Sequence, residues 1–130
     1  MGLLLLDTTV LIDVLRGRPA AGRLVGLRRS GQVPATSAIN VEEIVRGLRD
    51  TEQSTADRLF AGLHILPIGR AEAELAGSWR RQFAARGTTL HQADCLIAAT
   101  AVNAGARLAT GNPEDFPMTD LLLESWPVGS

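Results

Sequence analysis

The 130-residue sequence contains no lysine and no tyrosine, and its 13 basic residues are all arginines. The absence of lysine excludes a P-loop lysine, a Schiff-base lysine and any phosphate contact that depends on an ammonium group. Guanidinium groups remain, and their planar fork suits phosphate oxygens. Because the formal net charge is only −1, a nucleic acid would have to be met by a local basic patch and not by a field over the whole surface.

Cysteine, histidine and long apolar runs are also scarce. The single Cys95 cannot form an internal disulfide, and its apolar neighbours predict a buried side chain. His64 and His91 are isolated in the sequence, which excludes a Cys/His zinc cluster. No apolar stretch is long enough to span a bilayer, and Asp7 and Asp13 interrupt the N-terminal run. We therefore expect no membrane association and a cytoplasmic location.

The hydrophobic pattern indicates alternating strands and helices. With 45% hydrophobic and 21% charged residues, the chain has the composition of an ordinary globular protein, and its length suits one domain spanning residues 1–130. Short apolar runs predict strands at 2–6, 32–37, 64–68, 107–110 and 121–125. Helical periodicity predicts helices at 8–16, 19–30, 38–50, 54–63, 70–86 and 93–106. This order predicts a three-layer α/β/α sandwich with a mainly parallel, roughly five-stranded sheet.

Acidic residues stand at the ends of these predicted elements. Asp7 directly follows the first strand, and Asp94 opens the most apolar helix. Parallel strands end at one edge of the sheet, where ligands bind, so both acids are candidates for a functional site. Each also has an ordinary explanation. Asp7 could cap the helix that follows it, and Asp94 could favour its helix through the macrodipole.

Glu43 and Asp115 are ambiguous when each is considered alone. Glu43 lies away from the apolar stripe of its helix, where a solvated glutamate is common, and Asp115 lies in a Gly/Asn/Pro turn. Together with Asp7 and Asp94 they predict converging carboxylates. Two such charges about 4 Å apart repel by about 4 kcal/mol at an effective dielectric near 20. A hard divalent cation resolves that repulsion, and oxygen-only ligands favour Mg²⁺, with Mn²⁺ as the alternative.

Four segments in register carry a family resemblance. They are "LLLLDTTVLIDVL", "TSAINVEEIVRG", "ADCLIAATAVNAGARLAT" and "TGNPEDF", and together they span the chain from end to end. In this order they resemble a PIN-domain ribonuclease of the VapC toxin family, which belongs to type II toxin–antitoxin systems. The resemblance implies a PIN-like fold.

The resemblance also assigns roles to individual residues. The family places its second acid four residues before a glycine, so Gly47 selects Glu43 over Glu42. By the same likeness the catalytic acids are Asp7, Glu43, Asp94 and Asp115, with Asp7 and Asp94 as the metal ligands. Thr8 and Thr110 fall where relatives carry hydroxyl residues, which implies contacts with substrate. Asn112 stands where some relatives have a further acid, which leaves open whether the fourth acidic role belongs to Asp115 alone or is shared with Asn112.

The function implied by the resemblance is Mg²⁺-dependent hydrolysis of RNA phosphodiester bonds by a toxin paired with a VapB-type antitoxin. Such proteins form homodimers or toxin–antitoxin hetero-oligomers. Because lysine is absent, arginines on two predicted helices are the candidates for guiding RNA: Arg46, Arg49, Arg80, Arg81 and Arg86.

Three alternatives compete with this interpretation. A haloacid dehalogenase-like phosphohydrolase also places an Asp after its first strand, but it needs an Asp where Thr9 stands, and a phosphate-binding lysine. A receiver-like phosphoacceptor domain lacks its lysine here too. A non-catalytic PIN domain would have no need for the retained acids. The nuclease interpretation therefore leads.

Overall fold

The computed structural model describes residues 2–129, which form one five-stranded sheet flanked by helices. The strands are β1 (Leu3–Leu6), β2 (Val33–Ser37), β3 (His64–Leu66), β4 (Arg107–Thr110) and β5 (Leu123–Ser125). They lie in the order β3-β2-β1-β4-β5, and every pairing is parallel. The sequence predicted a mainly parallel sheet, and among the described residues it is entirely so.

Six α-helices and one 3₁₀ turn connect the strands. They are α1 (Thr8–Leu15), α2 (Pro19–Arg29), α3 (Ala38–Arg46), α4 (Gln53–Ala61), α5 (Arg70–Ala85), α6 (Gln92–Asn103) and η1 (Pro113–Asp115). The helix predicted over 38–50 ends earlier, because Gly47 takes the C-cap position of α3. Val45 falls on the apolar stripe of that helix by its spacing, yet it is 51% exposed. None of the described helices is long and apolar enough to cross a membrane.

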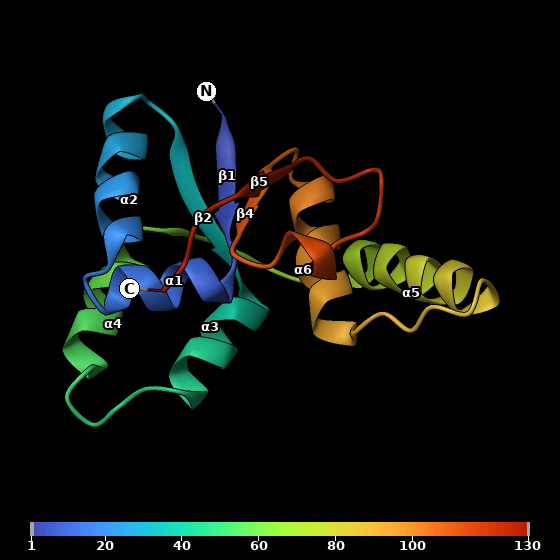
Figure 1. Ribbon diagram of the computed structural model, residues 1–130, viewed down its shortest axis with the longest axis horizontal. Helices are drawn as coiled ribbons and strands as arrows, with labels where there is room; N and C mark the ends of the chain where they lie inside the picture. The colour runs from blue at the N-terminus through green and yellow to red at the C-terminus, as the bar shows by residue number, and fades with distance from the viewer. Residues whose placement is uncertain (1, 130) are drawn as a thin grey trace.

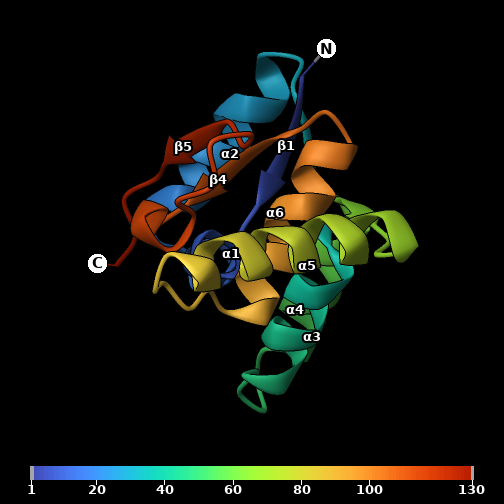
Figure 2. The same ribbon diagram turned by 90° about the vertical axis from the view of Figure 1, so that its right-hand side faces the viewer.

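The leucines of β1 divide the core between the two faces of the sheet. Leu5 packs with apolar residues of α5 and α6, whereas Leu4 and Leu6 pack with residues of α1, α2 and α4. Figures 1 and 2 show these two groups of helices on opposite sides of the strands. All three leucines are fully buried, and burial of each contributes about 1.5–3 kcal/mol. The predicted three-layer sandwich is confirmed.

The strand order determines where a ligand can bind. From β1 the chain proceeds to β2 on one side, while β4 and β5 occupy the other side of β1. The order therefore reverses beside β1, and such a reversal opens a crevice beyond the carboxyl ends of the strands. Figure 1 shows β1 running from the N-terminus into α1 at this edge. Asp7 is the residue between them.

Candidate active site

Asp7 is held rigidly at the end of β1. Its backbone N–H donates to the Ala109 carbonyl at 2.9 Å, which extends the pairing with β4 by one step. Asn40 Nδ2 donates to Asp7 Oδ1 at 3.3 Å, and the Thr110 hydroxyl donates to Oδ2 at 2.7 Å. The side chain makes no capping hydrogen bond to α1, so the helix-cap explanation does not account for it. Burial raises the pKa of Asp7, although these hydrogen bonds oppose the shift.

Glu43 reaches the same site through the start of α3. Ser37 and Asn40 form a reciprocal capping box that fixes this helix end beside β1. The Thr8 hydroxyl accepts from Asn40 Nδ2 at 3.0 Å and donates to Glu43 Oε1 at 2.6 Å. Glu42, by contrast, is exposed. The geometry therefore brings Glu43, and not Glu42, toward Asp7. Glu43 is also the residue that the family pattern around Gly47 selected.

Asp94 lies in the first turn of α6 and is half-buried. Burial raises its pKa to about 6, and the neighbouring carboxylates of Asp115, Asp7 and Glu43 add to that shift, while His91 opposes it. The other three predicted acids thus lie within electrostatic reach of Asp94, although the four come from separate parts of the chain: the β1–α1 junction, α3, α6 and η1. Asp94, His91 and Asp115 all line one cleft of about 320 Å³.

Asp115 is carried into this cleft by the turn after β4. The Asn112 N–H donates to the Thr110 hydroxyl at 3.1 Å, and the Gly111 N–H donates to the Thr9 hydroxyl at 3.0 Å. The first bond tightens the turn onto the end of β4, and the second ties it to α1. Asp115 itself is exposed, whereas Asn112 is half-buried. The side chain of Asp115 is therefore the one better placed to meet a ligand.

The hydroxyl of Thr110, which the resemblance implied to contact substrate, lies inside the protein. Its side chain is fully buried, and its hydroxyl already donates to Asp7. The geometry therefore favours Thr110 as a support for that carboxylate and not as a surface that a substrate touches. Thr8 is half-buried and occupied between Asn40 and Glu43.

Asn40 is the functional residue that the sequence analysis missed. It is fully buried and contributes hydrogen bonds to both Asp7 and Thr8. Asn40 lies three residues before Glu43 on the same face of the helix, but this spacing alone does not mark it as part of a site. A polar residue opposite an apolar stripe is usually solvated, and only the long-range contact with β1 reveals its role.

The C-terminal residues 126–129, termed here the C-terminal strap, cross the same turn. The Trp126 N–H donates to the Thr110 carbonyl at 2.9 Å, and the Gly129 N–H donates to the buried Asp13 carboxylate at 2.7 Å. Val128 lies so close to Gly111 that a Cβ added there would be 2.5 Å from Val128 Cγ2. Figure 1 shows the strap ending beside α1. The strap therefore fastens the turn between β4 and η1 to α1.

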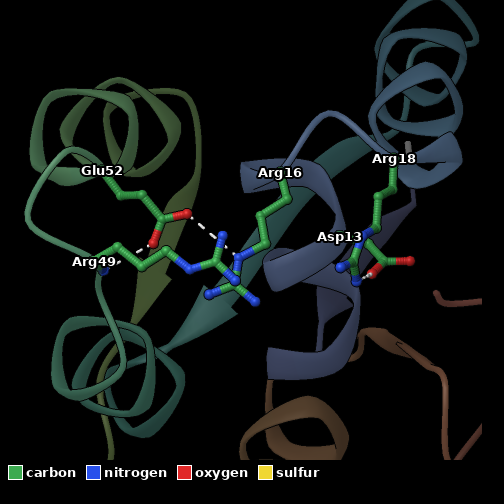
Figure 3. A network of polar contacts seen from close by, with 5 residues as sticks. All are labelled: Asp13, Arg16, Arg18, Arg49 and Glu52. Carbon is green, nitrogen blue, oxygen red and sulfur yellow. Dashed lines mark hydrogen bonds and ion pairs between the residues drawn. The ribbon is translucent and has the colours of Figure 1, made fainter. Parts of the chain in front are cut away.

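Of the arginines considered for RNA binding, Arg49 lies away from the acids. Its backbone N–H donates to Glu52 Oε1 at 2.8 Å, and Arg16 pairs with Glu52 Oε2 at 3.3 Å. Figure 3 shows the Arg49 side chain beside these two residues, between the loop before α4 and the end of α1. Arg86 is instead exposed at the end of α5, just before the segment that lines the cleft.

The donors present suit a hard divalent cation. Asp7, Asp94, Asp115 and Glu43 offer only oxygen, and no arginine or histidine of residues 2–129 forms an ion pair with them. Within that same range, no three His, Cys, Asp or Glu side chains are gathered into a ready-made metal shell. Mg²⁺ usually keeps several waters and binds through one or two carboxylates plus phosphate oxygens. The spread of the carboxylates is compatible with that mode of binding.

This combination of fold and acidic crevice agrees with the result of a family comparison. Residues 4–120 match the family model described as "PIN domain". The chain therefore belongs to the PIN domain family, and the dehalogenase-like and receiver-like alternatives are set aside.

Two further comparisons refine this assignment. The curated ribonuclease VapC10 of Mycobacterium tuberculosis is 36% identical over 127 residues, which cover 97% of this chain and 95% of the relative. Among solved structures, VapBC2 from Rickettsia felis bound to promoter DNA superposes with a TM-score of 0.84 over 95% of this chain and 98% of that chain, at 23% identity. That likeness concerns the fold alone. A toxin–antitoxin complex from Klebsiella pneumoniae matches with a TM-score of 0.72 and 27% identity, covering 94% of this chain and 96% of that one.

Proposed function

We propose that this protein is a metal-dependent ribonuclease of the VapC type, acting as one PIN domain over residues 1–130 and as the toxin of a VapBC-type pair. The observation that carries this proposal is the convergence of Asp7, Glu43, Asp94 and Asp115 at the crevice beside β1, where none of them forms an ion pair within residues 2–129. Neighbouring carboxylates that lack a counter-charge repel one another, and ionisable groups perturbed in this way are typical of functional sites.

Asp7 and Asp94 would hold the principal Mg²⁺ or Mn²⁺, with Asp115 joining directly or through water. When bound, such an ion polarises a phosphodiester oxygen and lowers the pKa of a nearby water. Asp7 remains able to bind it. Its two hydrogen bonds use one acceptor site on each oxygen, and a carboxylate has about four such sites.

Glu43 is the candidate general base. Thr8 engages Glu43 Oε1, which leaves Oε2 as the atom to take the proton of the water that attacks phosphorus. The bond from phosphorus to the leaving oxygen then breaks, and that oxygen takes a proton from solvent. Asn40 and Thr110 keep Asp7 in place during the reaction, because each donates to a different oxygen of its carboxylate.

The antitoxin partner is proposed to be of the VapB type and to insert a basic side chain among these acids. Pairing with such a side chain would satisfy the same unpaired charges as the metal ion does. The Klebsiella pneumoniae neighbour, which is a toxin–antitoxin complex, supports a protein partner of this kind. A homodimer or a toxin–antitoxin hetero-oligomer in the cytoplasm completes the proposal.

The test is cleavage of single-stranded RNA by purified protein with Mg²⁺, with Mn²⁺ and with EDTA. Asp7→Asn and Asp94→Asn should each lower kcat by about 10²-fold or more, within the range typical of lost catalytic groups. Glu42→Gln is the matched control, because this exposed neighbour of Glu43 lies outside the hydrogen-bonded cluster. Full activity in either Asp variant, or undiminished activity in EDTA, would overturn the assignment.

A further inference from the structure

A second concavity lies next to the acidic cleft, between α5 and the segment 117–120. Its volume is about 420 Å³, which falls within the usual range of about 300–1,000 Å³ for small-ligand sites. Trp79 and Met118 form its floor, since they line it and are only 4% and 3% exposed. We term this concavity the α5 groove.

The α5 groove is continuous with the cleft that contains the acids. Pro117 lines both concavities. On the other side, Arg86 lines the groove, and the residues that follow it, Thr88 to His91, line the cleft. The two concavities therefore adjoin, and both lie between the end of α5 with the residues after it and the segment around Pro117. Figure 2 shows α5 running across the front of the molecule beside η1 and the segment after it.

The lining of the α5 groove suits one unpaired nucleotide. The Arg86 guanidinium lies over the Phe83 ring, 4.4 Å from its centroid, which holds this planar group in place while the residue stays exposed. Arginine planes and aromatic rings are the surfaces on which proteins stack unpaired RNA bases, and the guanidinium also binds phosphate. Exposed Gln82 and Thr119 offer hydrogen bonds to a base edge.

Asp120 sets the orientation within the groove. It is exposed on the lining, where its carboxylate repels phosphate but accepts hydrogen bonds from a base. The phosphate then lies on the Arg86 side, toward the cleft, and the base lies toward Asp120. A peptide would bind this groove less favourably than a nucleotide, because it offers neither a nucleobase for stacking nor a phosphate for the guanidinium.

We propose that the α5 groove is a nucleotide-binding subsite, which holds a single-stranded RNA nucleotide next to the scissile phosphodiester and contributes to sequence preference. The proposal rests on the proposed ribonuclease function, because that function makes the adjoining cleft the place where RNA is cut. Arg86 and Gln82 are the residues that bind, and neither takes part in the bond cleavage itself.

The experiment is fluorescence anisotropy of a labelled single-stranded RNA oligomer of random sequence, carried out in the Asp94→Asn background so that the RNA is not cut. Arg86→Ala should weaken binding about tenfold, the scale of one lost stacking and phosphate contact. Gln82→Ala should weaken it about threefold and change the preferred base in a selection from the random pool. Arg70→Ala is the matched control and should stay within twofold, because Arg70 is exposed on the same helix, pairs with Glu74 and does not line the groove.

The outcomes separate the two proposals. If Arg86→Ala binds RNA as tightly as Arg70→Ala does, the α5 groove is not a nucleotide site. If Arg86→Ala instead loses only antitoxin binding, the groove is a protein-docking surface and the proposal is wrong. A protein that binds RNA through the groove but cleaves no RNA with either metal would contradict the ribonuclease function and leave the subsite standing.

Discussion

Replacing Asp94 by asparagine should stabilise the metal-free protein. The pKa of Asp94 is raised from its ordinary value of 3.8 to about 6, first by burial and then by the nearby carboxylates. A shift of this size corresponds to at most about 3 kcal/mol of penalty on the charged form. Because the side chain is only half-buried, we reduce this to about 1–2 kcal/mol. Loss of the favourable interaction with the α6 dipole subtracts about 0.3–1 kcal/mol.

The expected net gain of about 1 kcal/mol corresponds to a rise in Tm of about 3–5 °C for a chain of this length. It should depend on pH. Between 3.8 and about 6 the folded protein holds a proton on Asp94 that the unfolded chain has released, so wild-type stability falls as pH rises through this window. The gain from Asp94→Asn is therefore complete above pH 6 and shrinks toward pH 4.

Differential scanning calorimetry in EDTA at pH 7.5 and pH 4 measures this difference. Glu42→Gln is the control, because it also removes one acid but from an exposed position, and its Tm should match that of the wild type. Saturating Mg²⁺ should reverse the order, since an ion bound to the folded state adds about 2.7 kcal/mol at one hundred times its Kd. A Tm for Asp94→Asn several degrees below wild type in EDTA would refute this reasoning and make Asp94 a structural helix residue.

Three further results are expected. Asn40→Ala removes the donor to Asp7 and should cost about 1–3 kcal/mol in the free energy of unfolding, together with at least a tenfold loss in kcat; an unchanged Tm would contradict the hydrogen-bonded support. The methyl group of Gly111→Ala should clash with Val128 and lower the free energy of unfolding by about 1–3 kcal/mol. The double variant Gly111→Ala, Val128→Ala should recover most of the lost Tm, and no loss in the single variant would contradict a close contact between the C-terminal strap and this turn. Arg49→Ala should leave RNA affinity within twofold in an anisotropy titration, because its side chain lies in the polar network of Figure 3, and a large loss would restore Arg49 as an RNA contact.

The sequence predicted the fold because its signals are local. The leucine run of β1, the helix periods and the glycines that end them each act over a few residues, and strand–helix alternation then restricts the topology. Helix α3 was predicted too long, because the segment after Gly47 keeps an apolar residue, Leu48, at a helical spacing although the helix has ended. That residue packs with the core from outside the helix.

The site was predictable only in part, because its support is long-range. Asp7 and Asp94 were found from their places at a strand end and a helix start. Periodicity could not choose between Glu42 and Glu43, and the family pattern around Gly47 made that choice. The roles of Asn40 and Thr110 depend on their hydrogen bonds to Asp7, which lies 33 positions from Asn40 and 103 positions from Thr110 in the sequence. No local pattern encodes such contacts.

The most direct test of the central claim is anomalous scattering from crystals grown with Mn²⁺. We expect one strong anomalous peak between the carboxylates of Asp7 and Asp94, near Asp115, and loss of that peak in Asp94→Asn. Crystals saturated with Mn²⁺ that show no peak among these acids, or a peak only on another face of the protein, would contradict the account.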